Sequence, residues 1–119
     1  MAIIKSKRIY EAYSSDDGIR ILVDRLWPRG ISKEKAKLGF WLKEVAPSNE
    51  LRKWYNHDLN KFEEFKERYI SELKVGLQYE ALTELKQIII NTSGTVTLLY
   101  GAKEETFNQT FVLMELLKK

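Results

Sequence analysis

The sequence contains no cysteine among its 119 residues and only one histidine, His57. Without cysteine, disulfides, thiolate nucleophiles and zinc sites built on thiolates are excluded. A single imidazole also excludes the common histidine-rich metal sites, and no Asp-rich motif indicates a magnesium site. The nucleotide motifs GxGxxG and GxxxxGK[ST] do not occur either. We therefore predict neither a metal nor a cofactor.

Long apolar segments are also missing. No run approaches the ~20 apolar residues that a membrane-spanning helix needs, and the first five residues lack the apolar stretch of a secretion signal. We therefore expect a cytoplasmic protein that has no membrane partner.

The size of the chain is typical of one domain. At 119 residues, with 44% hydrophobic and 31% charged residues, the chain can bury one core of ordinary composition. No repeat, low-complexity segment or linker interrupts it. We expect residues 1–119 to form a single domain.

Positive charge is unevenly distributed. The net charge is +3, yet residues 1–40 hold nine Lys and Arg against five Asp and Glu. The excess is concentrated in residues 20–37, where only Asp24 and Glu34 are acidic. The cations of this stretch are Arg20, Arg25, Arg29, Lys33, Lys35 and Lys37. A local positive field of this kind attracts anions.

Four segments read as strands. Residues 3–10 mix β-branched and aromatic side chains with basic ones, and residues 19–23 form a short apolar run typical of a strand buried on both faces. Residues 95–100 are β-branched or apolar and are bounded by Gly94 and Gly101. Residues 38–45 suit either a strand or a buried helical turn, and we favour the strand.

Helices are predicted in the remaining segments. Ser48 is the expected N-cap of the first, and Asn60 with Glu63 has the spacing of a capping box for a second, which Gly76 ends. A third is predicted over residues 79–91 and a closing helix over residues 106–119. In the closing helix, the spacing of Thr106 and Gln109 makes Gln109 the expected cap.

Strands that alternate with helices indicate an α/β fold. We predict a small, mostly parallel sheet of about four strands with helices packed on its faces. Ligands of such sheets bind beyond the carboxyl ends of the strands. That rule selects two loops, residues 24–30 and residues 101–106.

Three sequence blocks carry a resemblance to a known family. They are Val23-Asp24-Arg25-Leu26-Trp27-Pro28-Arg29-Gly30, the segment from Ala46-Pro47-Ser48 through Leu51-Arg52-Lys53-Trp54 to His57-Asp58, and Thr97-Leu98-Leu99-Tyr100 through Lys103 to Asn108. The chain resembles the YeaO-like family of uncharacterised proteins, a branch of domain-of-unknown-function family 488. The resemblance implies a small α/β domain but no reaction and no catalytic residue. Many relatives have histidine where this chain has Phe107, so a mechanism that needs an imidazole there would fail here.

The candidate ligand-binding residues lie in the two selected loops and just after them. Arg25 and Arg29 offer guanidinium groups that bind carboxylate or phosphate in bidentate fashion, although Arg25 could instead pair with Asp24 or a helix carboxylate. Lys103 adds a point charge, and Tyr100 a hydroxyl or a stacking face. Asn108 would sit in the first turn of the closing helix, where free N–H groups favour anions.

Two residues are candidates for proton transfer. Asp24 could orient Arg25 or act as a base, and His57 titrates near neutral pH. A plain ion pair for Asp24 and a structural or rim role for His57 are the competing interpretations.

The sequence leaves three functional hypotheses. The first is a small enzyme or ligand-binding domain for an anionic small molecule, phosphorylated or nucleotide-like, at the strand-end crevice. The second is a nucleic-acid-binding accessory module that uses residues 20–37. The third is a protein-interaction domain, which includes homodimerisation through an aromatic helix face.

Overall fold

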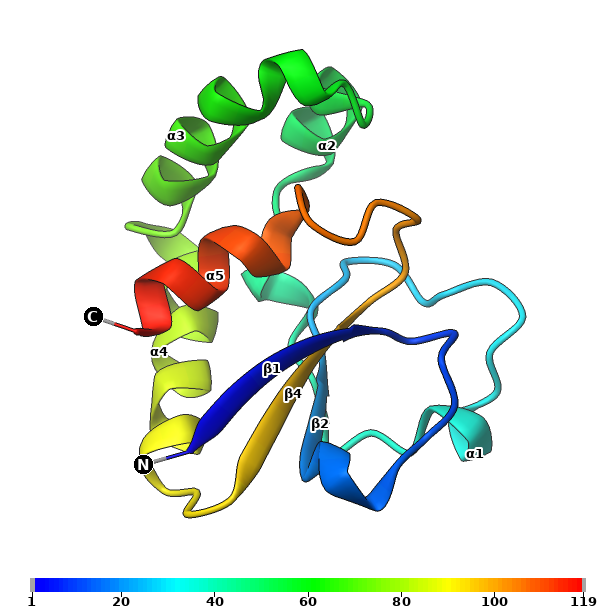
Figure 1. Cartoon of the computed structure of the whole chain (residues 1–119). Coiled ribbons are helices and arrows are strands. Elements are labelled where there is room, and N and C mark those ends of the chain that lie inside the picture. The colour runs from blue at the N-terminus through cyan, green and yellow to red at the C-terminus, as the bar shows by residue number, and fades with distance from the viewer. Residues whose placement is uncertain (1, 119) are drawn as a thin grey trace.

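The computed structural model describes residues 2–118, and within them the chain forms four strands and five helices (Figure 1). The strands are β1 (Ile3–Arg8), β2 (Ile19–Leu22), β3 (Phe40–Trp41) and β4 (Thr95–Tyr100), and the helices are α1 (Lys33–Ala36), α2 (Asn49–Tyr55), α3 (Phe62–Glu72), α4 (Gly76–Ile90) and α5 (Gln109–Leu117). Short 3₁₀ turns occur at Ser15–Asp17, Lys43–Val45 and Leu59–Lys61. None of the helices within residues 2–118 has the length and apolar character needed to cross a membrane.

The strands form one sheet in the order β1-β4-β2-β3, and every neighbouring pair is parallel. Ile3 lies opposite Thr95, and Ile21 lies opposite Leu98 on one side and Phe40 on the other. Because all strands run the same way, their carboxyl ends meet at one edge of the sheet. The predicted α/β class with about four mostly parallel strands is confirmed.

The larger part of the core lies between one face of the sheet and the helices. Ile21, Val96 and Leu98 point to this face, where they pack with apolar side chains of α2, α3, α4 and α5. Figure 1 shows α4 and α5 on that side of the sheet, with α2 and α3 forming a hairpin beyond its end. Burial of these side chains stabilises the fold by about 2 kcal/mol per large residue.

The opposite face of the sheet is covered by an irregular segment. Leu22 and Leu99 point to it and form a second buried cluster with Ile9 and Ala36. The long connection between β2 and β3, which carries α1, supplies the cover. Since β2 is buried on both faces, its sequence is almost continuously apolar, as predicted for residues 19–23.

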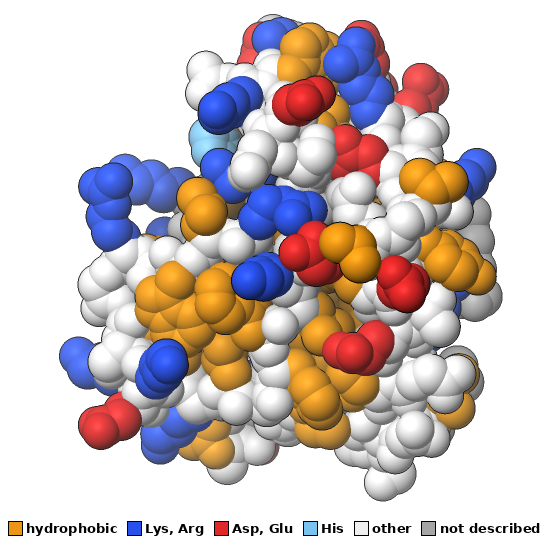
Figure 2. Space-filling view, turned by 180° about the vertical axis from the view of Figure 1, so that it is seen from behind, with side chains coloured by type: hydrophobic (Ala, Val, Ile, Leu, Met, Phe, Trp, Pro, Cys, Tyr) orange, Lys and Arg blue, Asp and Glu red, His pale blue; other side chains and the backbone are white. Residues whose placement is uncertain are grey.

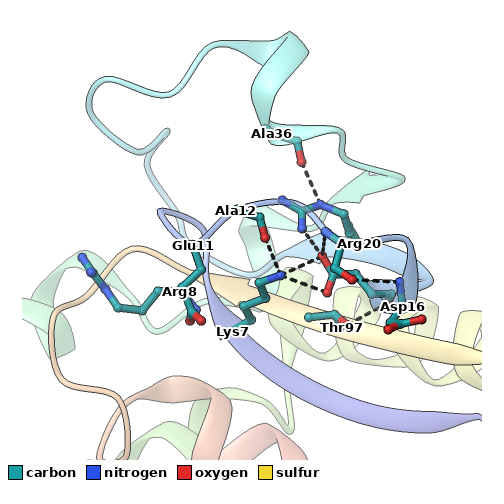
Figure 3. A network of polar contacts seen from close by, with 10 residues as sticks. Lys7, Arg8, Glu11, Ala12, Asp16, Arg20, Ala36 and Thr97 are labelled. Carbon is teal, nitrogen blue, oxygen red and sulfur yellow. Dashed lines mark hydrogen bonds and ion pairs between the residues drawn. The ribbon is translucent and has the colours of Figure 1, made fainter.

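A cluster of charged residues lies on this second face. It lies away from the carboxyl ends of β2 and β4, where the two loops selected from the sequence begin. Asp17 accepts hydrogen bonds from the Lys7 ammonium at 3.0 Å and from the Arg20 guanidinium at 2.5 Å. Arg20 also donates to the Ala36 carbonyl, and the Thr97 hydroxyl donates to the Asp17 carbonyl (Figure 3). Arg20 and Asp17 each keep only 2% of their surface exposed. The charge of Arg20, counted above in the basic stretch, is therefore neutralised inside the fold.

The edge strand is shorter than predicted. Of residues 38–45, only Phe40 and Trp41 pair with β2, and Lys43–Val45 turns as a 3₁₀ helix. Phe40 and Trp41 keep 41% and 38% of their surface exposed. The apolar residues of this segment therefore do not indicate a strand buried on both faces. Figure 2 shows hydrophobic side chains gathered in two areas of the surface, one bordered by Lys and Arg side chains and the other with Asp and Glu side chains at its edge.

Several predicted helix boundaries are wrong. Asp58, not Asn60, accepts the first backbone N–H of the turn that leads into α3, and α3 ends at Glu72. Gly76 does not end that helix but begins α4, with φ at +64°. The Ser48 cap of α2 is confirmed, since its hydroxyl accepts the Leu51 N–H.

Candidate functional site

The two loops selected from the sequence are joined by a hydrogen bond at the carboxyl edge of the sheet. The backbone N–H of Gly101, directly after β4, donates to Asp24 Oδ2, two residues after β2, at 2.8 Å. A Cβ at position 101 would lie 2.9 Å from the same oxygen, so a larger residue there would displace the Asp24 carboxylate. Residues distant in sequence thus form one rim of the sheet.

A cavity of about 440 Å³ opens at this rim. Its walls come from residues 24–28 after β2, residues 101–102 after β4, residues 107–109 at the start of α5, several residues within 46–57, and Tyr10 and Phe65. Small-molecule sites have volumes of roughly 300–1,000 Å³ and combine apolar walls with a few polar groups. The position, size and mixed lining of this cavity make it the candidate ligand site.

Asp24 is the acidic group of the cavity. Its Oδ2 accepts the Gly101 N–H, and its Oδ1 accepts the Gln109 side-chain amide at 2.6 Å. Burial raises the pKa of the Asp24 carboxyl from its ordinary 3.8 to about 6, although these two hydrogen bonds and the charge of Arg52 act in the opposite direction. Asp24 can therefore change charge within the physiological range.

Arg25 lines the cavity, but its guanidinium is held by the protein. It donates to the Pro47 carbonyl at 3.1 Å and the Ala46 carbonyl at 2.9 Å, and it pairs with Glu44 at 3.2 Å. These bonds tie the loop after β2 to the segment that enters α2. These contacts agree with the alternative interpretation of Arg25, in which it holds its loop in place by pairing with a carboxylate. That carboxylate is Glu44.

Three other predicted ligand residues lie outside the cavity lining. Arg29 is exposed at the far end of its loop, where its carbonyl accepts the Tyr10 hydroxyl at 2.9 Å. Tyr100 is buried beneath the loop, and its hydroxyl points to the Glu105 carbonyl at 3.4 Å. Lys103 is exposed on the loop after β4. The structure brings none of these three side chains together with Asp24.

The cap of α5 is Asn108 and not Gln109, so the predicted cap is wrong. Asn108 is the N-cap of α5: its Oδ1 accepts the Thr110 N–H at 2.8 Å, and its Nδ2 donates to the Glu104 carbonyl at 2.7 Å. Asn108 is buried with its polar atoms used in these bonds. Gln109, predicted to be the cap, instead reaches Asp24. Asn108 contributes to the cavity wall, whereas Gln109 is the residue with a polar contact inside it.

His57 lies at the rim of the cavity. It follows Asn56, and both residues have left-handed backbone conformations, with φ at 57° and 45°. Asn and His are among the residues that adopt this conformation most readily. Asp58 caps the next turn, and no carboxylate within residues 2–118 bonds to the His57 ring. The histidine side chain is visible at the surface close to Lys and Arg side chains (Figure 2).

Arg52 and Lys53 also line the cavity, although the sequence does not indicate them as site residues. Both belong to α2 and line the cavity. The sequence places two adjacent cations on a helix, but it contains no signal that α2 crosses the strand ends. That position depends on the turn at Lys43–Val45 and on the bonds of Arg25 to the segment before α2.

The comparisons with known proteins identify the family. A family model described as the inactive DUF488-N3 subclade matches residues 3–119. The uncharacterised protein YeaO of Escherichia coli K12 is 43% identical over 97% of this chain and 96% of its own length. The uncharacterised protein Rv3073c of Mycobacterium tuberculosis is 40% identical over 96% of this chain and 92% of its own length. The chain therefore belongs to the DUF488-N3 family, in the subclade described as inactive. No solved structure shows a significant match.

Proposed function

We propose that this protein binds an anionic small molecule, phosphorylated or nucleotide-like, in the strand-end cavity. The observation that supports the proposal best is the pair of cations, Arg52 and Lys53, beside a cavity of about 440 Å³ at the carboxyl edge of a parallel sheet. We expect it to act in the cytoplasm, as the sequence predicts.

Arg52 and Lys53 have donors available for a ligand. Within residues 2–118, the only side-chain bond of Arg52 is a long one, at 3.4 Å, to Asn49 Oδ1 on the same helix, and Lys53 makes none. Arg25, by contrast, already donates hydrogen bonds to Glu44 and to two backbone carbonyls. A phosphate or carboxylate at this wall would receive charge-assisted hydrogen bonds from the two free groups.

Binding is a better description than catalysis. The description of the subclade as inactive agrees with a protein that holds a ligand without converting it. The resemblance leads us to expect histidine at position 107 in many relatives. In this chain, Phe107 gives the cavity an apolar wall in place of an imidazole. Proton transfer by Asp24 and His57 stays a prediction.

The test is a thermal-shift panel at millimolar ligand. Ribose 5-phosphate, inorganic phosphate and the four ribonucleoside monophosphates should include at least one compound that raises the melting temperature of the wild type. The shift should be lost in the double variant Arg52→Gln, Lys53→Gln and kept in Lys86→Gln, an exposed lysine on α4 outside the cavity. Absence of any shift, or an equal shift in the double variant, would contradict the proposal.

The two other hypotheses from the sequence stay predictions and are separable. Arg20 and Arg25 are bonded inside the fold, which leaves Arg29, Lys33, Lys35 and Lys37 as the exposed cations of residues 20–37. Nucleic-acid binding through this stretch would appear as retention on nucleic acid at about 0.15 M salt that falls steeply as salt rises. Homodimerisation would appear in the sedimentation coefficient.

A further inference from the structure

Asp24 is partly buried and has no cationic partner, in contrast to the buried Asp17. Its two oxygens accept one hydrogen bond each, from Gly101 and from Gln109, and both donors are neutral amides. No ion pair involves Asp24 within residues 2–118. An ionised carboxylate offers about four lone-pair sites, so roughly two remain open.

Asp17, a buried carboxylate on the other face of the sheet, has two cationic partners. Asp17 pairs with Lys7 at 3.0 Å and with Arg20 at 2.5 Å, and Figure 3 shows the Lys7 and Arg20 side chains pointing toward one another. A buried charge without such a partner is costly. Asp24 faces a cavity instead of a cation, and a ligand that supplied hydrogen-bond donors would complete its set of bonds.

The walls near Asp24 are suited to a flat ring. Trp27, Tyr10 and Phe107 all line the cavity. Contacts with neighbouring residues fix two of these rings. The Tyr10 hydroxyl donates to the Arg29 carbonyl, and the Phe107 ring packs on the Phe62 ring with 5.1 Å between the ring centroids. Aromatic side chains of this kind offer stacking faces to heteroaromatic rings.

We propose that the ligand is a nucleotide whose base donates N–H groups to Asp24 and whose phosphate faces Arg52 and Lys53. This inference rests on the anion-binding function proposed above and names the ligand class. An N–H donor matches the open acceptor sites of Asp24, whereas a second anionic group there would be repelled. The Gly101 and Gln109 bonds hold the carboxylate in place, so the acceptor is already oriented before the ligand arrives.

The first test compares ligands on the wild-type protein by isothermal titration calorimetry. At least one of the four ribonucleoside monophosphates should bind tenfold or more tightly than ribose 5-phosphate, which has the phosphate but no base. The same nucleotide methylated at the donor nitrogen of its base should lose most of that advantage. Equal affinity of all four nucleotides and ribose 5-phosphate would overturn this inference while leaving the anion site intact.

The second test uses two variants to separate the claims. Asp24→Asn should lose the preference for the nucleotide over ribose 5-phosphate but keep its affinity for ribose 5-phosphate. Arg52→Gln should weaken both ligands by a similar factor. A nucleotide preference that survives both Asp24→Asn and base methylation would show that stacking alone produces it and would overturn the inference. Failure of every phosphorylated compound to bind would instead refute the function proposed above.

Discussion

Gly101 and Asp24, 77 residues apart, are joined by a hydrogen bond of 2.8 Å between the backbone N–H of the first and Oδ2 of the second. The bond connects the loops that follow β4 and β2 and fixes a carboxylate in the wall of the strand-end cavity. Gln109 donates to the other oxygen, so α5 is part of the same arrangement. The proposed ligand chemistry depends on this fixed and unpaired carboxylate.

Asp24 should make stability fall as pH rises. Its pKa is about 6 in the folded protein against an ordinary 3.8, so the folded state binds the proton more tightly between these values. The resulting stabilisation is fully present below pH 3.8 and is lost as pH rises through 6, and it amounts to about 3 kcal/mol. Urea unfolding of the wild type and Asp24→Asn over this range measures it.

The difference between these two proteins isolates Asp24, because all other titrating groups are common to both. The free energy of unfolding of the wild type should decrease relative to that of Asp24→Asn between pH 4 and pH 7. A difference that stays constant with pH would mean that the carboxyl has an ordinary pKa and is well solvated.

Asp17 should contribute with the opposite sign. Burial raises its pKa, but hydrogen bonds from Lys7, the Ser14 backbone and Arg20 outweigh burial and hold the pKa below the ordinary 3.8. Its stabilisation is present above pH 3.8 and is lost as pH falls further. At neutral pH, Asp17→Asn leaves the Arg20 guanidinium buried without its anion and should cost about 3–5 kcal/mol in denaturant unfolding.

Asp16→Asn is the matched control for that variant. Asp16 is the neighbouring aspartate, is exposed, and forms none of the ion pairs found within residues 2–118. Its replacement should change stability by no more than about 0.5 kcal/mol. Similar losses of stability in Asp17→Asn and Asp16→Asn would contradict a stabilising role for the ion pairs of Asp17.

Asn108 should affect stability through its capping bonds. Asn108→Ala removes the acceptor of the Thr110 N–H and the donor to the Glu104 carbonyl, which should cost about 1–2 kcal/mol. Asn91→Ala, at an exposed position after α4, should cost less than about 0.5 kcal/mol. Thermal or urea unfolding of both variants measures these losses. An Asn108→Ala protein with the stability of the wild type would contradict the capping role.

The sequence predicted those elements that a local pattern determines. Residues 95–100 match β4 because a β-branched run lies between two glycines, and the Ser48 cap is correct because its hydroxyl acts within one turn. Residues 38–45 contain a shorter strand than predicted, because Phe40 and Trp41 are aromatic at an exposed edge of the sheet and not in its core. Apolar character alone does not separate these two situations.

The site was predictable only in part, for a related reason. Asp24 and the loop after β4 follow from the rule that ligands bind at strand ends. Arg52 and Lys53 do not follow from it, because α2 reaches the cavity through a turn and through the bonds of Arg25. The wrong cap has a local cause. Asn108 and Gln109 can each supply an acceptor for the first turn of α5, and Asn108 is the cap because its backbone is extended.

Ligand titration of the isotope-labelled protein, followed in nitrogen–proton correlation spectra, tests the central claim most directly. With millimolar ribonucleoside monophosphates, the largest shifts should occur at the Gly101 backbone amide, the Gln109 side-chain amide, and the backbone amides of Arg52 and Lys53. Resonances of α4, outside the cavity, should stay in place. Spectra that do not change, or that change only outside the cavity, would contradict the account.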